Sequence, residues 1–63
     1  MDPKFSSGQK IKNTRSNKIG IIRRLRDDTY EQKHNHPGIY YYCVDYDDGT
    51  FETYEYEKYL EKI

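Results

Sequence analysis

The chain has 63 residues, a formal net charge of zero, 35% charged residues and a single cysteine. This length makes one domain near the lower limit for unaided folding, and the lone Cys43 excludes a scaffold held by internal disulfides. No apolar run approaches the ~20 residues of a membrane span and no signal-peptide core follows Met1, so we expect a soluble, intracellular (cytoplasmic) protein.

The first half of the chain predicts two strands and a long loop. Residues 1–7 lack periodicity and are expected to be a flexible lead-in, although Phe5 could dock on the fold. Residues 8–12 predict a short strand, and residues 13–17 a turn rich in Asn and Ser. Residues 18–26 predict a second strand because they are rich in β-branched Ile, with a bulge or bend at Gly20. The polar residues 27–37 predict an exposed loop.

A tyrosine-rich hairpin follows. Apolar side chains recur at every second position, which places them on one face of a strand: Tyr40, Tyr42, Val44 and Tyr46. Asp48-Gly49 predicts a tight turn, either a two-residue type I′ turn or a three-residue loop with Gly49 in a bulge. Residues 50–54 predict the return strand.

The end of the chain predicts a short helical turn. Its apolar residues are spaced by three or four positions, and a one-turn helix followed by a brief strand at residues 60–63 fits equally well. Four or five short antiparallel strands around one small core predict an all-β, SH3-like barrel over residues 8–63, since an open sheet of this size would leave long edges unpaired. Aliphatic residues are few, so most tyrosine rings are expected in the core or at its margin, with their hydroxyls in water.

The order of these pieces resembles the SH3-like barrels of the Tudor, KOW and chromo-barrel type. Gly8-x-x-Ile11, Gly20-x-Ile22-x-x-Leu25, the Tyr-x-Val-x-Tyr strand with Asp-Asp-Gly, and Glu57-Lys-Tyr-Leu60 carry the likeness. The pattern is most similar to the Tudor-like modules at the C-terminus of bacterial superfamily 1 DNA helicases. The resemblance implies binding rather than catalysis, of methylated side chains, RNA or other proteins. The chain departs from the eukaryotic Tudor pattern because it has no Trp and no aromatic residue between Phe5 and Tyr30.

The tyrosines outside the core face are the first candidate site. Three rings and a nearby carboxylate could form a cage for a cation, whereas core packing is the alternative use of the same rings. We expect a protein partner to dock on this acidic hairpin surface, through Tyr41, Asp45, Glu52, Tyr54 and Tyr56.

The basic residues are the second candidate site. Residues 1–26 carry a side-chain charge of about +7 and residues 27–63 about −7, which suits either cross-strand pairing or the steering of a charged partner. A nucleic-acid-binding module is therefore the alternative function, through Lys10, Lys12, Arg23, Arg24 and Arg26.

The sequence favours no enzyme. It contains no Ser/His/Asp set, P-loop or dinucleotide glycine motif, and His34-x-His36 lacks the further ligands of a metal site. We expect no cofactor, metal, membrane partner or small-molecule substrate.

Overall fold

The computed structural model describes residues 2–34 and 39–63, apart from the side chain of Glu31. The chain forms five strands, namely β1 (Lys10–Asn13), β2 (Ile19–Arg26), β3 (Tyr41–Tyr46), β4 (Phe51–Tyr56) and β5 (Leu60–Lys62). A one-turn helix α1 (Tyr30–Lys33) precedes β3, and a 3₁₀ turn η1 (Glu57–Tyr59) precedes β5. The predicted all-β class is confirmed, and so is the C-terminal helical turn with its brief final strand.

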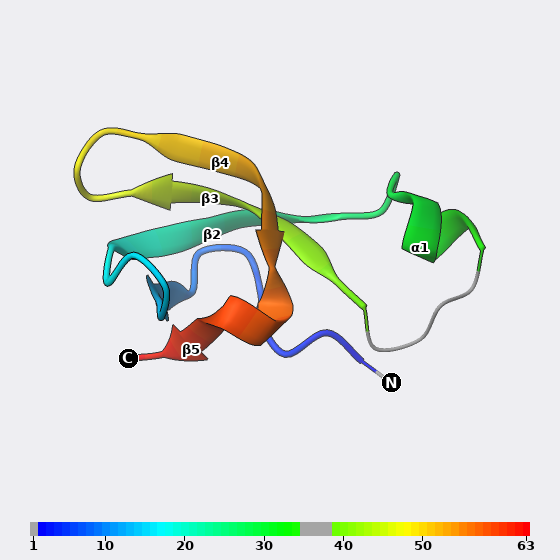
Figure 1. Ribbon diagram of the computed structural model, residues 1–63, viewed down its shortest axis with the longest axis horizontal. Helices are drawn as coiled ribbons and strands as arrows, with labels where there is room; N and C mark the ends of the chain where they lie inside the picture. Colours follow the sequence, from blue (N-terminus) through cyan, green and yellow to red (C-terminus); the bar gives the residue numbers. More distant parts are fainter. Residues whose placement is uncertain (1, 35–38) are drawn as a thin grey trace.

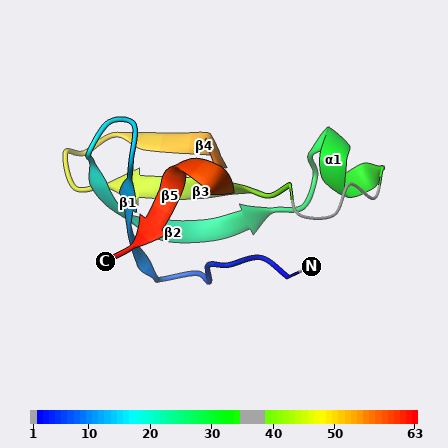
Figure 2. The same cartoon turned by 60° about the horizontal axis from the view of Figure 1, so that its bottom comes forward.

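The strands form one antiparallel sheet in the order β4-β3-β2-β1-β5 (Figure 1). β1 to β4 follow one another as a meander, and η1 then carries the chain across so that β5 pairs with β1. This arrangement is consistent with a small SH3-like fold. Figures 1 and 2 show α1 at the end of the molecule opposite the β3–β4 turn.

The core lies where the sequence pattern predicts it. Tyr40, Tyr42, Val44 and Tyr46 are all buried, so the predicted core face is confirmed, and Cys43 on the opposite face of β3 is buried as well. The other core residues are Phe5, Ile11, Ile22 and Leu60, with Leu25 packed against them. The buried Phe5 ring meets Tyr42 edge-on, with 5.6 Å between ring centroids. The N-terminal segment therefore contributes a side chain to the core.

The prediction that tyrosine hydroxyls face water is wrong for two core rings. The Tyr42 hydroxyl donates a hydrogen bond of 2.6 Å to Glu57 Oε2, and the Tyr46 hydroxyl donates to Glu55 Oε2. Burial, together with the hydrogen bond to Glu57, raises the pKa of Tyr42 above its ordinary value. In a chain with few aliphatic residues, these rings are buried whole and find carboxylates as partners.

The bend expected at Gly20 lies elsewhere. Gly20 pairs regularly with Ile11 and Tyr46, and the register shifts instead between Ile22 and Arg24. A second shift lies in the β3–β4 pairing, and both are level with Cys43, where they bend the sheet. Gly20 serves close packing, because a Cβ there would lie 2.7 Å from the Asp45 carbonyl oxygen.

The β3–β4 turn is the three-residue alternative. The Tyr46 amide donates to the Thr50 carbonyl, Asp45 lies opposite Phe51, and Gly49 has a φ of 88° while Asp48 has a negative φ. A type I′ turn needs positive φ at two adjacent residues, so the two-residue turn is wrong. The like-charge pair of Asp45 and Glu52 that it would create does not form.

The expected loop over residues 27–37 contains α1. Thr29, which is almost fully buried, caps this helix through its hydroxyl, which accepts a hydrogen bond of 3.3 Å from the Gln32 amide. Thr-x-x-Gln is a capping-box signal, and it indicates a helix start that the polar composition alone obscures. The sequence His36-Pro37-Gly38, which predicts a break at the end of this loop, lies outside the described residues.

Candidate peptide-binding surface

Four tyrosine rings from three elements form a continuous row at the surface. Tyr41 of β3 lies between Tyr54 and Tyr56 of β4, at centroid distances of 5.6 and 5.4 Å, and Tyr56 meets Tyr59 of η1 at 5.6 Å. Tyr54 is exposed and the others are half-buried. We call Tyr54, Tyr41, Tyr56 and Tyr59 the tyrosine strip. Such rings offer broad contact area at a small cost in side-chain entropy.

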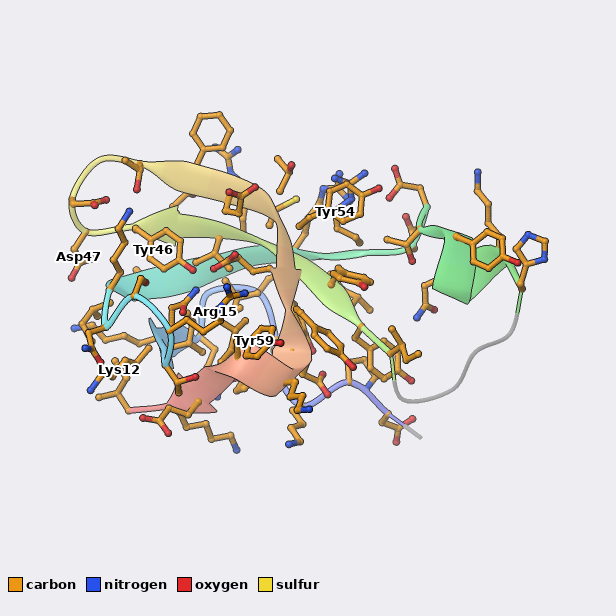
Figure 3. The ribbon with its side chains drawn as sticks, viewed as in Figure 1. Lys12, Arg15, Tyr46, Asp47, Tyr54 and Tyr59 are labelled. Carbon is orange, nitrogen blue, oxygen red and sulfur yellow. The ribbon has the colours of Figure 1, made fainter. Side chains whose placement is uncertain are left out.

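An arginine lies over the ring at each end of the strip. The Arg26 guanidinium is 4.1 Å from the Tyr54 centroid, and that of Arg15 is 4.8 Å from the Tyr59 centroid. Arg26 is also held by two 3.0 Å hydrogen bonds to Asp28 and one to the Thr53 carbonyl. The pairing lowers the pKa of Asp28 and raises that of Arg26. Figure 3 shows Arg15 beside Tyr59, with Tyr54 farther along toward α1.

An open groove of about 430 Å³ runs beside the strip. We call it the tyrosine groove, and its lining residues come from the end of β1, the β1–β2 loop, β4 and η1: Asn13, Arg15, Ser16, Tyr54, Glu55, Tyr56 and Tyr59. Asn13 shapes its wall, since the Asn13 Oδ1 atom accepts hydrogen bonds from the backbone amides of Arg15 and Ser16. The same side chain donates to the Tyr46 hydroxyl and to Glu55 Oε2, which fixes Glu55 in the groove.

A second groove, of about 240 Å³, continues toward the β3–β4 turn. This hairpin groove shares three residues with the tyrosine groove, namely Asn13, Ser16 and Glu55. Lys18 and Asp48 form a 3.0 Å ion pair near it, which joins the β1–β2 loop to the turn. Hydrogen bonds from Thr50, followed by the contact with Lys18, lower the pKa of Asp48 to about 2.

The five residues predicted to bind a protein are divided by the structure. Tyr41, Tyr54 and Tyr56 come together in the strip, whereas Glu52 lines the hairpin groove. Asp45 lies beside Arg23 at 3.2 Å, on the face of the sheet opposite Val44. Because Tyr41 contacts both of the other rings directly, these three tyrosines do not surround an empty cage.

The five predicted basic residues come from two neighbouring strands, β1 and β2. Arg23 and Arg26 each pair with an aspartate, and Arg24 lies on β2 between them in sequence. Lys12 lies on β1 in register with Glu61, far from Tyr54 in Figure 3, and Lys10 is on the same strand. Lys10 lies opposite Ile21, two positions before Arg23, so basic residues of the two strands are neighbours and the nucleic-acid-binding site stays a prediction.

The remaining sequence signals leave the grooves as the candidate site. His34 stacks on Tyr30 at 4.2 Å, while His36 lies outside the described residues. Within residues 2–34 and 39–63, no three His, Cys, Asp or Glu side chains are grouped as metal ligands. Neither helical turn in that part of the chain has the length and apolar character needed to cross a bilayer.

The site predicted from the sequence did not include Asn13, Arg15, Glu55 or Tyr59, although Arg15 and Glu55 belong to the basic and acidic sets of the chain. The spacing of the apolar residues at the end of the chain predicts a single apolar face that includes Tyr59 and Leu60. In the structure Leu60 is buried in the core, whereas Tyr59 lies in the strip. No local pattern indicates that Asn13 meets Glu55, because 42 residues separate them along the chain. No protein-family model, curated protein or solved structure matches the chain, so the argument for its function rests on this surface.

Proposed function

We propose that the protein is a non-catalytic protein-interaction module that binds an extended peptide segment of its partner along the tyrosine strip. The observation that carries the proposal is the continuous contact of four surface rings beside an open groove. Tyrosine is enriched at protein interfaces because it combines a large apolar ring with a hydroxyl that hydrogen-bonds. Aromatic-lined grooves are a recurrent mode of peptide recognition.

Contacts with neighbouring side chains and backbone hold the arginines at both ends of the strip in place, as in a preorganised site. Arg26 is held by Asp28 and by the Thr53 carbonyl while it stacks on Tyr54, and Asn13 braces the loop that carries Arg15. A surface held in this way loses less conformational entropy when a ligand binds.

Nucleic-acid binding remains the second proposal. In its favour, Phe51 is 66% exposed and, among the described residues, no ion pair involves Lys10, Lys12 or Arg24. Against it, aspartates accompany Arg23 and Arg26, and carboxylates that repel phosphate line both grooves.

The test of the first proposal is capture of the partner from native extract, followed by binding measurements with purified components. Tyr54→Ala should weaken binding about tenfold or more, as expected for an anchor ring. The control is Tyr30→Ala, which removes another exposed tyrosine, on α1 and outside the strip. Equal affinity of both variants for the partner would refute the proposed surface.

The same preparation tests the second proposal. If the protein binds oligonucleotides, log affinity should fall with log salt by about one unit for each phosphate contact. Absence of oligonucleotide binding at low salt would eliminate it.

A further inference from the structure

We infer that the tyrosine groove selects a partner segment carrying an unmodified arginine or lysine, whose cation hydrogen-bonds to Glu55. This inference rests on the proposed function, because it names the chemistry of the segment that lies along the strip.

Among the described residues, Glu55 is the only carboxylate that lines both grooves, at the point where they share residues. Its side chain is partly buried and is held by two donors, Asn13 Nδ2 and the Tyr46 hydroxyl, both of which bond to Oε2. A carboxylate held in this way does not have to be reoriented when a ligand arrives.

The second oxygen of Glu55 is available to a ligand. Among the described residues, no hydrogen bond ends on Oε1 and no ion pair joins Glu55 to a basic side chain. Every buried side-chain oxygen in that part of the chain has a partner, so Oε1 must reach the surface. A partly buried carboxylate without a cation favours an incoming N–H donor that carries positive charge.

The surroundings of Glu55 favour the same occupant. Tyr54, Tyr56 and Tyr59 line the groove with rings that attract a cation, and the structure already places two of its own arginines over Tyr54 and Tyr59. Glu52 adds negative charge in the adjoining hairpin groove. Two basic residues also line the grooves, but Arg15 lies over the Tyr59 ring and Lys18 pairs with Asp48. The carboxylates are left to attract a basic peptide rather than an acidic one.

The mode of recognition predicts that methylation weakens binding. The contact with Oε1 needs an N–H group, whereas a trimethylated lysine has none. The direct ring contacts of Tyr41 with Tyr54 and Tyr56 leave no closed cage there to compensate.

The test uses isotope-labelled full-length protein and a set of synthetic ten-residue peptides that are identical except at the central position. That position is arginine, citrulline, lysine, trimethyl-lysine or glutamate, and affinities come from chemical-shift titrations. We expect the arginine peptide to bind about tenfold more tightly than its neutral isostere citrulline. Lysine should bind more tightly than trimethyl-lysine, and glutamate should bind most weakly.

Two variants locate the effect. Glu55→Gln should abolish the preference for arginine over citrulline, while Glu61→Gln, a change of the same kind on β5 outside both grooves, should retain it. The wild-type comparison of arginine with citrulline is decisive even if Glu55→Gln fails to fold.

The inference is overturned if citrulline binds as well as arginine, if trimethyl-lysine binds more tightly than lysine, or if no arginine peptide binds at millimolar concentration. In each of these cases the proposed function still stands when Tyr54→Ala weakens binding of the captured partner. The two failures are therefore distinguishable.

Discussion

Tyrosines have two roles in this protein, and the face of β3 on which a ring lies separates them. Tyr40, Tyr42 and Tyr46 fill the core, whereas the neighbouring Tyr41 joins the surface strip. The core hydroxyls of Tyr42 and Tyr46 donate hydrogen bonds to glutamates of η1 and β4, so these buried polar groups have partners on other elements.

The Tyr42 hydroxyl should contribute measurably to stability. It donates to the buried Glu57 and accepts from the Phe5 amide at 3.3 Å, so Tyr42→Phe leaves buried groups short of a partner. We expect a loss of about 1–3 kcal/mol in the free energy of unfolding, measured by urea denaturation. Tyr30→Phe, at an exposed ring, should change it by less than about 0.5 kcal/mol.

The same hydroxyl predicts a pH dependence. Because the pKa of Tyr42 is raised in the folded protein, its stabilising effect is present below the ordinary tyrosine pKa of about 10 and declines as pH rises above it. Between pH 9 and pH 11, a range that roughly spans that value, the free energy of unfolding should fall more steeply with pH for the wild type than for Tyr42→Phe. Parallel curves would contradict this assignment.

The lowered pKa of Asp48 predicts the opposite pH dependence of stability, at acid pH. Its lowered pKa means that its contribution is present above the ordinary aspartate value of about 4 and is lost as pH falls toward 2. The free energy of unfolding of Asp48→Asn should therefore differ from that of the wild type above pH ~4, and the two values should converge near pH ~2. A carboxyl NMR titration checks the pKa directly, and Thr50→Val should raise it by removing a hydrogen bond.

Among the elements, two bulges level with Cys43 curve the sheet, and Gly20 allows β2 and β3 to pack closely. The bulges let a short meander bend until β5 can pair with β1. The bend also brings β4 toward the end of β1, where Asn13 meets Glu55. The two grooves are a consequence of this curvature.

Gly20→Ala tests the close approach of β2 and β3. The new Cβ would lie 2.7 Å from the Asp45 carbonyl oxygen and 2.9 Å from Val44 Cγ1, so the strands must separate. We expect a loss of about 2–3 kcal/mol in the free energy of unfolding.

Gly49→Ala is the comparison. Its Cβ would meet open space, and only the positive φ of 88° is unfavourable, which costs about 1–2 kcal/mol. If denaturation shows Gly49→Ala to be the more damaging change, the packing role of Gly20 is refuted.

At the scale of the whole molecule, a core of few aliphatic residues is completed by the N-terminal segment. The Gly8 amide donates to the Ile22 carbonyl at 2.7 Å, and the Lys4 amide donates to Glu57 at 3.0 Å. These bonds hold Phe5 against Tyr42. In so small a domain, one further ring is a large part of the buried apolar area.

Phe5→Ala should lower the free energy of unfolding by about 3–5 kcal/mol, which is comparable with the whole stability of a small domain. We therefore expect loss of cooperative thermal unfolding, monitored by circular dichroism, at temperatures where the wild type is folded. Phe5→Leu, which keeps most of the volume, should remain folded with a cost below about 1.5 kcal/mol. A folded and fully stable Phe5→Ala variant would show that the segment is dispensable.

Local sequence patterns are sufficient to predict the all-β class, the buried face of β3, the hairpin after it and the helical turn before β5. These follow from local rules, since side chains alternate along a strand and Gly49 accepts a positive φ in a turn. Local rules left the turn type open, and they also supplied the capping box at Thr29 that the loop assignment overlooked.

Which side chains meet across the fold depends on contacts between distant parts of the chain. The strip joins rings from β3, β4 and η1, and Glu55 finds Asn13 across 42 residues of sequence. Such contacts depend on strand register, on the two bulges and on the crossing of β5 over to β1, which are set by packing of the whole core. For that reason the sequence could identify Tyr41, Tyr54 and Tyr56 as candidates, but it could not place Tyr59, Arg15 and Glu55 beside them.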